Sequence, residues 1–174
     1  MEKYPWYEKV DRNETLLQGD LVNFCPIIIP PTSTIIGENI KLEVKEYNVI
    51  VMSQSCDLIL KKIELVLICP YYSLDEFETM SLFFKNKEGK ETLRKGNIPG
   101  YHLLNKIEIP GFETEFLVVD FRSVFSIPLN FINDLVKTKG ERIRLLSPYR
   151  EHLSQAFARF FMRVGLPVDI PPFR

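Results

Sequence analysis

The sequence contains no long hydrophobic run. Its longest apolar stretches are residues 25–31 and 65–70, whereas a helix that crosses a bilayer needs about 20 apolar residues. The first residues, Met1–Pro5, also lack the apolar segment of a secretory signal peptide. We therefore expect a cytoplasmic protein without a membrane partner.

Cysteine and histidine are scarce as well. The chain has three cysteines, Cys25, Cys56 and Cys69, and two histidines. The number of cysteines is odd and no two have the C-x-x-C spacing, which argues against a disulfide scaffold and a zinc knuckle. No histidine is spaced from a carboxylate as metal ligands on one helix are. We expect neither a metal nor another cofactor.

Neither sign of charge is in excess, because 22 Lys and Arg residues face 23 Asp and Glu residues. This balance excludes a protein that binds nucleic acid through basic charge over its whole surface. Residues 137–174 nevertheless hold eight of the basic and three of the acidic residues, which leaves 14 basic and 20 acidic residues before them. We predict a basic surface that binds phosphate or an acidic partner; the plainer interpretation is a solvated flank of the fold. Its members are Arg142, Arg144, Arg150, Arg159 and Arg163.

The hydrophobic pattern predicts a mainly β fold with helices. Alternating or continuous apolar segments predict about six strands, the clearest at 21–25, 40–44, 49–52, 63–69 and 115–121. The strands are not regularly separated by helices, so a doubly wound sheet is disfavoured. We predict an α+β fold: a small curled antiparallel sheet or SH3-like barrel with helices packed on it.

Two helices are predicted. Ser73 and Glu76 have the spacing of a capping box. Residues 148–164 carry an apolar stripe and predict a second helix, with Ser147 as its N-cap and Gly165 as its stop. That stripe serves either the core of the chain or a dimer interface. Residues 85–100 are expected to form a mobile surface loop, with room for a short helical turn. We divide the chain into an N-terminal arm, 1–18, and a single domain, 19–174.

Four short motifs follow one another in a distinctive order. They are Gly19–Val22 at the start of a strand, Val49–Ser53, Leu65–Pro70, and Val118–Asp120 followed by Arg122 and Ser123. With a closing helix over 148–164, this order resembles the MazF/PemK family of bacterial toxins. The resemblance implies an SH3-like barrel, a homodimer, and a setting in a toxin–antitoxin, defence or stress system.

The resemblance also implies cleavage of single-stranded RNA without a metal, and here the sequence departs from the family. The family's Arg before the second apolar strand is missing, since that stretch offers only Lys45, and Tyr72 stands where the family has Thr. An ammonium does not replace the planar fork of a guanidinium. We therefore predict a non-catalytic binding module for single-stranded RNA or for an acidic protein such as an antitoxin segment. The alternative is an active ribonuclease that uses Lys45, Ser73 and Arg122.

Three further features are candidates for chemistry. Gln54 and Asp57 follow a strand and are candidates for binding a polar ligand, and Cys56 between them is a candidate nucleophile if His102 serves as its base. The plainer interpretation makes Cys56 a core thiol and His102 a structural hydrogen-bonding group. Tyr72 offers a ring on which an unpaired base can stack. Asp120 and Arg122 share one strand face and are predicted to form an ion pair, unless Arg122 instead contacts phosphate or a partner.

Overall fold

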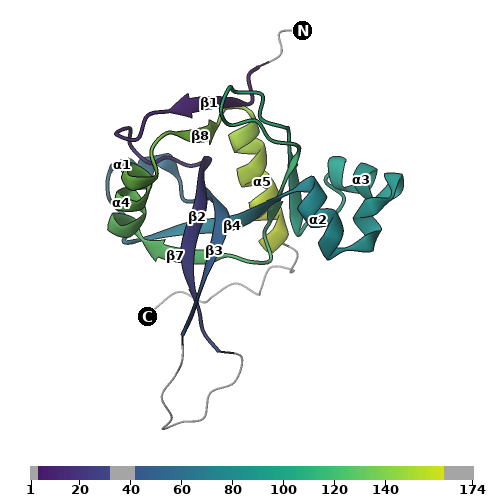
Figure 1. Cartoon of the computed structure of the whole chain (residues 1–174), viewed down its shortest axis with the longest axis horizontal. Coiled ribbons are helices and arrows are strands. Elements are labelled where there is room, and N and C mark those ends of the chain that lie inside the picture. Colours follow the sequence, from purple (N-terminus) through teal and green to yellow (C-terminus); the bar gives the residue numbers. More distant parts are fainter. Residues whose placement is uncertain (1–3, 32–41, 163–174) are drawn as a thin grey trace, which may run out of the picture.

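The computed structural model describes residues 4–31 and 42–162 of the chain (Figure 1). Within these ranges the strands are β1 (Tyr7–Val10), β2 (Asp20–Ile29), β3 (Glu43–Val51), β4 (Leu65–Ser73), β5 (Tyr101–Leu104), β6 (Leu117–Asp120), β7 (Phe125–Pro128) and β8 (Arg142–Leu145). The helices are α1 (Ser55–Ile59), α2 (Leu74–Met80), α3 (Lys87–Arg94), α4 (Leu129–Lys139) and α5 (Tyr149–Phe161), with one 3-10 helix, η1 (Leu82–Lys85).

All strand pairs of the described sheet are antiparallel. The strands follow the order β1-β8-β2-β3-β4-β6-β5, and β7 pairs with β4 beside this path. The predicted α+β class with an antiparallel sheet is confirmed. The sheet is not closed into a barrel, because β1 and β5 lie at its two ends and do not pair with each other. The expectation of an SH3-like barrel is corrected on this point.

Strand β4 connects the two parts of the sheet. Its first residues, 65–68, pair with β7, and its last residues, 71–73, pair with β6 along the same edge. The sequence predicted that the strand stops at Pro70, but the strand continues through it. Pro70 lies between the segment paired with β7 and the segment paired with β6, where the missing N–H of proline costs no ladder bond on that edge.

Strands β2 and β3 form a long hairpin that extends away from the rest of the sheet (Figure 1). Strand β3 runs from Glu43 to Val51, so the segments predicted as separate strands at 40–44 and 49–52 are joined in the described residues. Leu42 and Val44 were expected to face the core, yet both are 60% exposed. The reason is their place on the projecting part of the hairpin, where no helix of the described chain covers them; Ile40 lies outside the described residues.

The helices after β4 cover one face of β6 and β5. Ser73 and Glu76 form the predicted capping box: Ser73 Oγ accepts from Glu76 N at 3.2 Å, and Glu76 Oε2 accepts from Ser73 N at 2.9 Å. Part of the expected mobile loop is in fact helix α3, which begins where Asn86 Oδ1 accepts from Gly89 N at 2.8 Å. Phe77, Phe84 and Leu93 pack against Val118 between these helices and the sheet.

Helix α5 covers the opposite face of the same strands. Its Phe157 and Phe160 rings contact Phe121, so this part of the predicted stripe serves the core of the chain, whereas Phe161 is exposed. Ser147 does not cap the helix, because the N-cap position falls on Pro148 without a side-chain hydrogen bond. Gly165, the predicted end of the helix, lies outside the described residues.

The N-terminal arm is part of the sheet. Strand β1 pairs with β8 from Tyr7↔Leu145 to Val10↔Arg142. Trp6 stacks on Tyr149 of α5 with ring centroids 3.6 Å apart, so the first and last elements of the described chain are in contact.

Candidate functional site: a basic groove along strand β5

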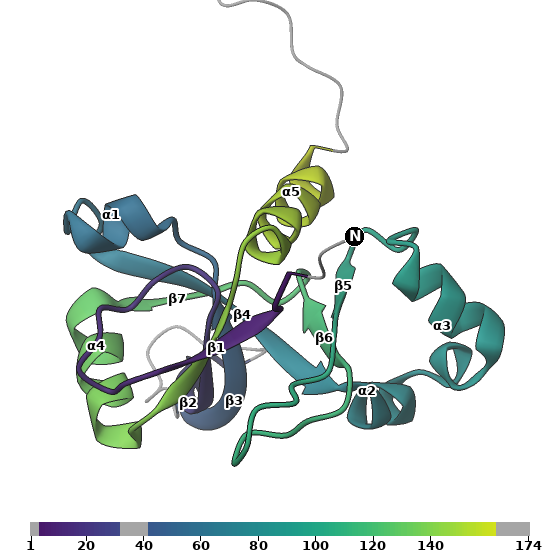
Figure 2. The same cartoon turned by 90° about the horizontal axis from the view of Figure 1, so that it is seen from above.

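A cavity of about 400 Å³ follows the free edge of β5, between the end of α3 and one side of α5. Figure 2 shows β5 between these two helices. We call this cavity the β5 groove. Its lining consists of Leu93, Arg94, Lys95, Gly96, Pro99, Tyr101, His102, Leu103, His152, Gln155, Ala156 and Arg159.

The charges of the groove are all positive. None of its lining residues is acidic. Lys95 and Arg159 are exposed on opposite walls, and neither pairs with a carboxylate within the described chain. Arg94 is bound to Glu91 with Nη2–Oε2 at 2.8 Å, so its charge is partly offset. The groove is therefore suited to an anionic ligand.

His102 lines the groove, and its pKa depends on its burial and on the charges around it. Its ring lies almost parallel to that of Phe121, with centroids 6.2 Å apart. Burial, together with the smaller electrostatic effects of His152 and Arg159, lowers the pKa of His102 to about 4. The imidazole is therefore neutral at pH 7, and the nearby charges that act on it are cationic.

Arg122 lies next to the groove, beyond Gly100. Its Nε and Nη2 donate to the two oxygens of buried Asp120 at 3.0 and 3.1 Å, which confirms the predicted ion pair. Its guanidinium carbon lies 4.4 Å from the centre of the Tyr101 ring, a distance typical of a cation–π contact. A Cβ at position 100 would approach Arg122 Cγ to 3.2 Å, so glycine leaves room for this side chain.

Tyr72 belongs to the same sheet face as Asp120 and Tyr101. It pairs with Val118, two residues before Asp120, and Asp120 pairs with Tyr101. Burial raises the pKa of Tyr72, and the charge of Asp120 raises it further, while Arg122 acts in the opposite direction. The structure thus brings Tyr72 and Arg122, two of the predicted binding residues, into one neighbourhood, where Tyr72 is half-buried.

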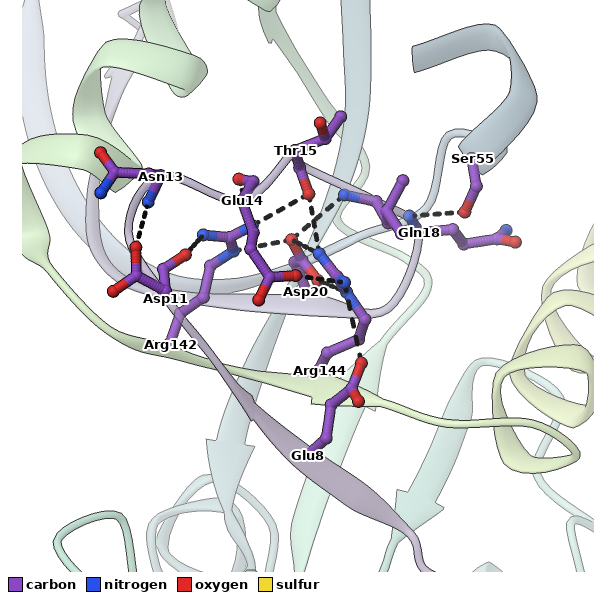
Figure 3. Close-up of polar contacts among 11 residues, drawn as sticks. Glu8, Asp11, Asn13, Glu14, Thr15, Gln18, Asp20, Ser55, Arg142 and Arg144 are labelled. Atoms are coloured by element: carbon purple, nitrogen blue, oxygen red, sulfur yellow. Dashed lines mark hydrogen bonds and ion pairs between the residues drawn. The ribbon is translucent and has the colours of Figure 1, made fainter. Parts of the chain in front are cut away.

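Arg142 and Arg144 occupy a different place from the one predicted. Both are 5% exposed and both bind Asp20, which is fully buried (Figure 3). Arg142 Nε lies 2.7 Å and Arg144 Nε 2.5 Å from the carboxylate. Their other donors bind the carbonyl oxygens of Asp11, Glu14 and Thr15.

We call Asp20, Arg142 and Arg144 the arginine clamp. The clamp holds the 11–18 segment to β8 and β2, so its arginines are not on a basic surface. Arg150 is also separate, because it binds Glu151 at 2.8 Å and lies beside Gly19. Of the predicted arginines only Arg159 lines the groove, and Arg163 lies outside the described residues.

The segment Ser53–Asp57 divides into structural and exposed residues. Ser53 Oγ accepts from Leu67 N at 2.8 Å, and Ser55 Oγ accepts from Gln18 N at 3.2 Å. Gln54 makes no capping bond to α1, and Cys56 is exposed rather than a core thiol. Figure 2 shows α1 and β5 at opposite sides of the molecule, so Cys56 and His102 are not brought together.

The three relocated catalytic candidates are not assembled either. Lys45 lies 3.5 Å from Glu43 on the projecting hairpin, Ser73 is used in the capping box, and Arg122 binds Asp120. Within the described chain none of the three contacts another.

A larger cavity of about 660 Å³ opens over β2, β8 and the 107–117 loop. Its charged lining includes Glu76, Glu113 and Glu141 against Lys139, together with Arg142 of the clamp. The predominance of carboxylates makes this cavity unsuited to the phosphate or acidic ligands predicted from the sequence.

The sequence reasoning missed the cations that α3 contributes. Arg94 and Lys95 fall in the stretch predicted as a loop. The available signal was an asparagine N-cap at Asn86 and a helix stop at Gly96, which together predict a short helix ending in basic residues.

No family model matches the chain, and no curated protein matches it. None of the described helices is both long and apolar enough to cross a membrane. Among residues 4–31 and 42–162, no three His, Cys, Asp or Glu side chains are grouped so that they can hold a metal ion.

Proposed function

We propose that this protein is a non-catalytic binding module that takes an acidic segment of a partner protein in the β5 groove. The observation that carries the proposal is the lining of that groove, which holds Arg94, Lys95 and Arg159 and no carboxylate. A site of one charge sign with partly buried walls attracts ligands of the opposite sign and speeds their association.

The state of the candidate catalytic groups supports binding over RNA cleavage. A ribonuclease needs a base and a cationic group positioned together at one phosphodiester. Lys45, Ser73 and Arg122 each have a separate structural partner. The predicted resemblance to the MazF/PemK family, with its toxin–antitoxin or defence setting and its homodimer, remains part of this proposal and supplies no residue to the groove.

A protein ligand fits the groove better than single-stranded RNA. Binding of unpaired bases relies on aromatic faces that are free to stack. Tyr101 is the only aromatic residue other than histidine in the described lining. Its ring is already in contact with the Arg122 guanidinium and with the rings of Phe77 and Phe84. Tyr71 is buried and its hydroxyl donates to Asn23. The groove therefore offers charge without a stacking platform.

The test uses fluorescence anisotropy with two labelled probes, an eight-residue peptide of alternating Glu and Val and a twelve-residue oligouridylate. We expect the peptide to bind and its Gln/Val counterpart not to bind. Lys95→Glu/Arg159→Glu should weaken peptide binding by at least about tenfold. The matched control is Lys62→Glu/Lys137→Glu, which changes the net charge equally at exposed positions outside the groove and should leave binding unchanged.

Two results would overturn the proposal. The first is equal weakening by the groove variant and the control variant, which would show that binding depends on net charge and not on the groove. The second is oligouridylate that binds in the same place more tightly than the peptide, which would favour the RNA-binding alternative.

A further inference from the structure

The floor of the β5 groove is a strand edge with which no strand of the described chain pairs. Strand β5 ends the path of the described sheet, so one of its two edges has no neighbouring strand. Phe121 N donates to Gly100 O at 2.9 Å, and in an antiparallel ladder the residues that bond across the strands alternate. His102 and Leu104 therefore bond to β6, whereas the N–H and C=O of Leu103 point into the groove.

The neighbouring backbone groups agree with this assignment. Tyr101 N donates to Ile98 O at 3.0 Å, on the side away from β6. The C=O of Tyr101 therefore faces the groove together with the two groups of Leu103. These three groups have the spacing with which one strand binds another.

The walls of the groove carry cations on both sides of this edge. Arg94 and Lys95 lie on the α3 side, and Arg159 lies on the α5 side. Side chains of an extended peptide alternate between two opposite directions. A strand laid along β5 would thus direct its acidic side chains toward one cationic wall or the other.

Resting on the proposed function, we propose that the acidic partner segment binds as an added β-strand on β5, with backbone hydrogen bonds to Leu103 and with its carboxylates on one face, toward either the Lys95 wall or the Arg159 wall. Peptide recognition by strand addition takes its affinity from main-chain hydrogen bonds and its specificity from the flanking side chains. Here the flanking side chains select for negative charge.

The same charges exclude a second copy of this chain as the occupant. Pairing of two β5 edges would bring Lys95 and Arg159 of one molecule close to the same residues of the other. Charged side chains beside a free edge are a common means by which proteins prevent such edge-to-edge association. A complementary acidic strand meets no such barrier.

Amide hydrogen exchange of the full-length protein tests the binding mode. In the free protein the Leu103 amide should exchange faster than the amides of His102 and Leu104, which are bonded to β6. Saturation with the Glu/Val peptide should slow Leu103 exchange by at least about tenfold and leave His102 nearly unchanged. An unchanged Leu103 amide in a protein that binds the peptide would overturn strand addition while leaving the proposed function intact.

A backbone-modified peptide gives a second, independent measurement. The Glu/Val peptide with every amide N-methylated keeps its charge but loses its donors, and it should bind at least about tenfold more weakly. Equal affinity of the two peptides would show that side-chain charge alone is recognised. If neither peptide binds, the proposed function itself fails, so the two failures are distinguishable.

Discussion

Neutralising Asp20 should destabilise the protein more than any other single change of charge in the clamp. The Asp20→Asn variant leaves Arg142 and Arg144 buried, 5% exposed, with no negative charge between them. Removing one partner of a buried ion pair costs about 3–5 kcal/mol, because the remaining charge is uncompensated. A domain of this size has a free energy of unfolding of about 5–15 kcal/mol, so the loss is a large part of the total.

Urea unfolding measures this loss directly. With a urea dependence near 2 kcal/mol/M, the expected destabilisation lowers the unfolding midpoint by roughly 1.5–2.5 M. Glu14→Gln is the matched control, since Glu14 approaches Arg144 only to 3.8 Å and its side chain is 58% exposed. An exposed pair of this kind contributes about 0–1 kcal/mol.

The outcome that refutes the reasoning is a loss below about 1 kcal/mol for Asp20→Asn. That result would mean that the carbonyl oxygens of Asp11, Glu14 and Thr15 suffice to hold the two arginines, and that the carboxylate is not needed. A loss as large for Glu14→Gln would mean that the exposed edge of the clamp, and not its buried centre, supplies the stability.

Three more predictions concern single side chains. The pKa of His102 is lowered to about 4, so the neutral ring favours the fold above pH 6.5 and this stability is lost as the pH falls toward 4. We expect the free energy of unfolding to be about 2 kcal/mol lower at pH 5 than at pH 7. His102→Gln should remove that difference, as measured by urea unfolding at the two pH values. Ser73→Ala breaks the capping box and should cost about 1 kcal/mol, whereas Ser81→Ala, which removes no capping bond, should leave the thermal midpoint unchanged. Cys56 is exposed and the other two cysteines are buried, so one thiol should react with Ellman's reagent in the native protein and three only in urea; three fast thiols would contradict the burial.

The sequence was most informative where hydrophobic residues are periodic and turns are local. The continuous apolar stretch before Asp120 and the capping box at Ser73 depend on neighbours within a few residues, and both were predicted correctly. The predicted stop at Pro70 was wrong because the change of partner along β4 that makes a proline tolerable there is a tertiary feature. The exposed Val44 shows the same limit, since its alternation with polar residues does not reveal whether a helix lies over it.

The candidate site was harder to predict because its parts come from distant segments. Lys95 follows α3, His102 belongs to β5, and Arg159 lies on α5. Only the folded chain places these three residues around one groove. The clamp illustrates the same difficulty, since Asp20 and Arg142 are 122 positions apart. Clustering of arginines near the C-terminal end predicted a basic surface, but it did not show that Arg142 and Arg144 are paired with Asp20 inside the fold.

The stacking of Trp6 on Tyr149 gives the protein a built-in optical probe. Trp6 is the only tryptophan of the chain, and its ring lies against the first turn of α5 while Leu146 N donates to its carbonyl oxygen at 2.8 Å. Tryptophan emission therefore reports on one place only, the junction of the first strand with the last described helix. Separation of Trp6 from Tyr149 at this junction should therefore change the emission.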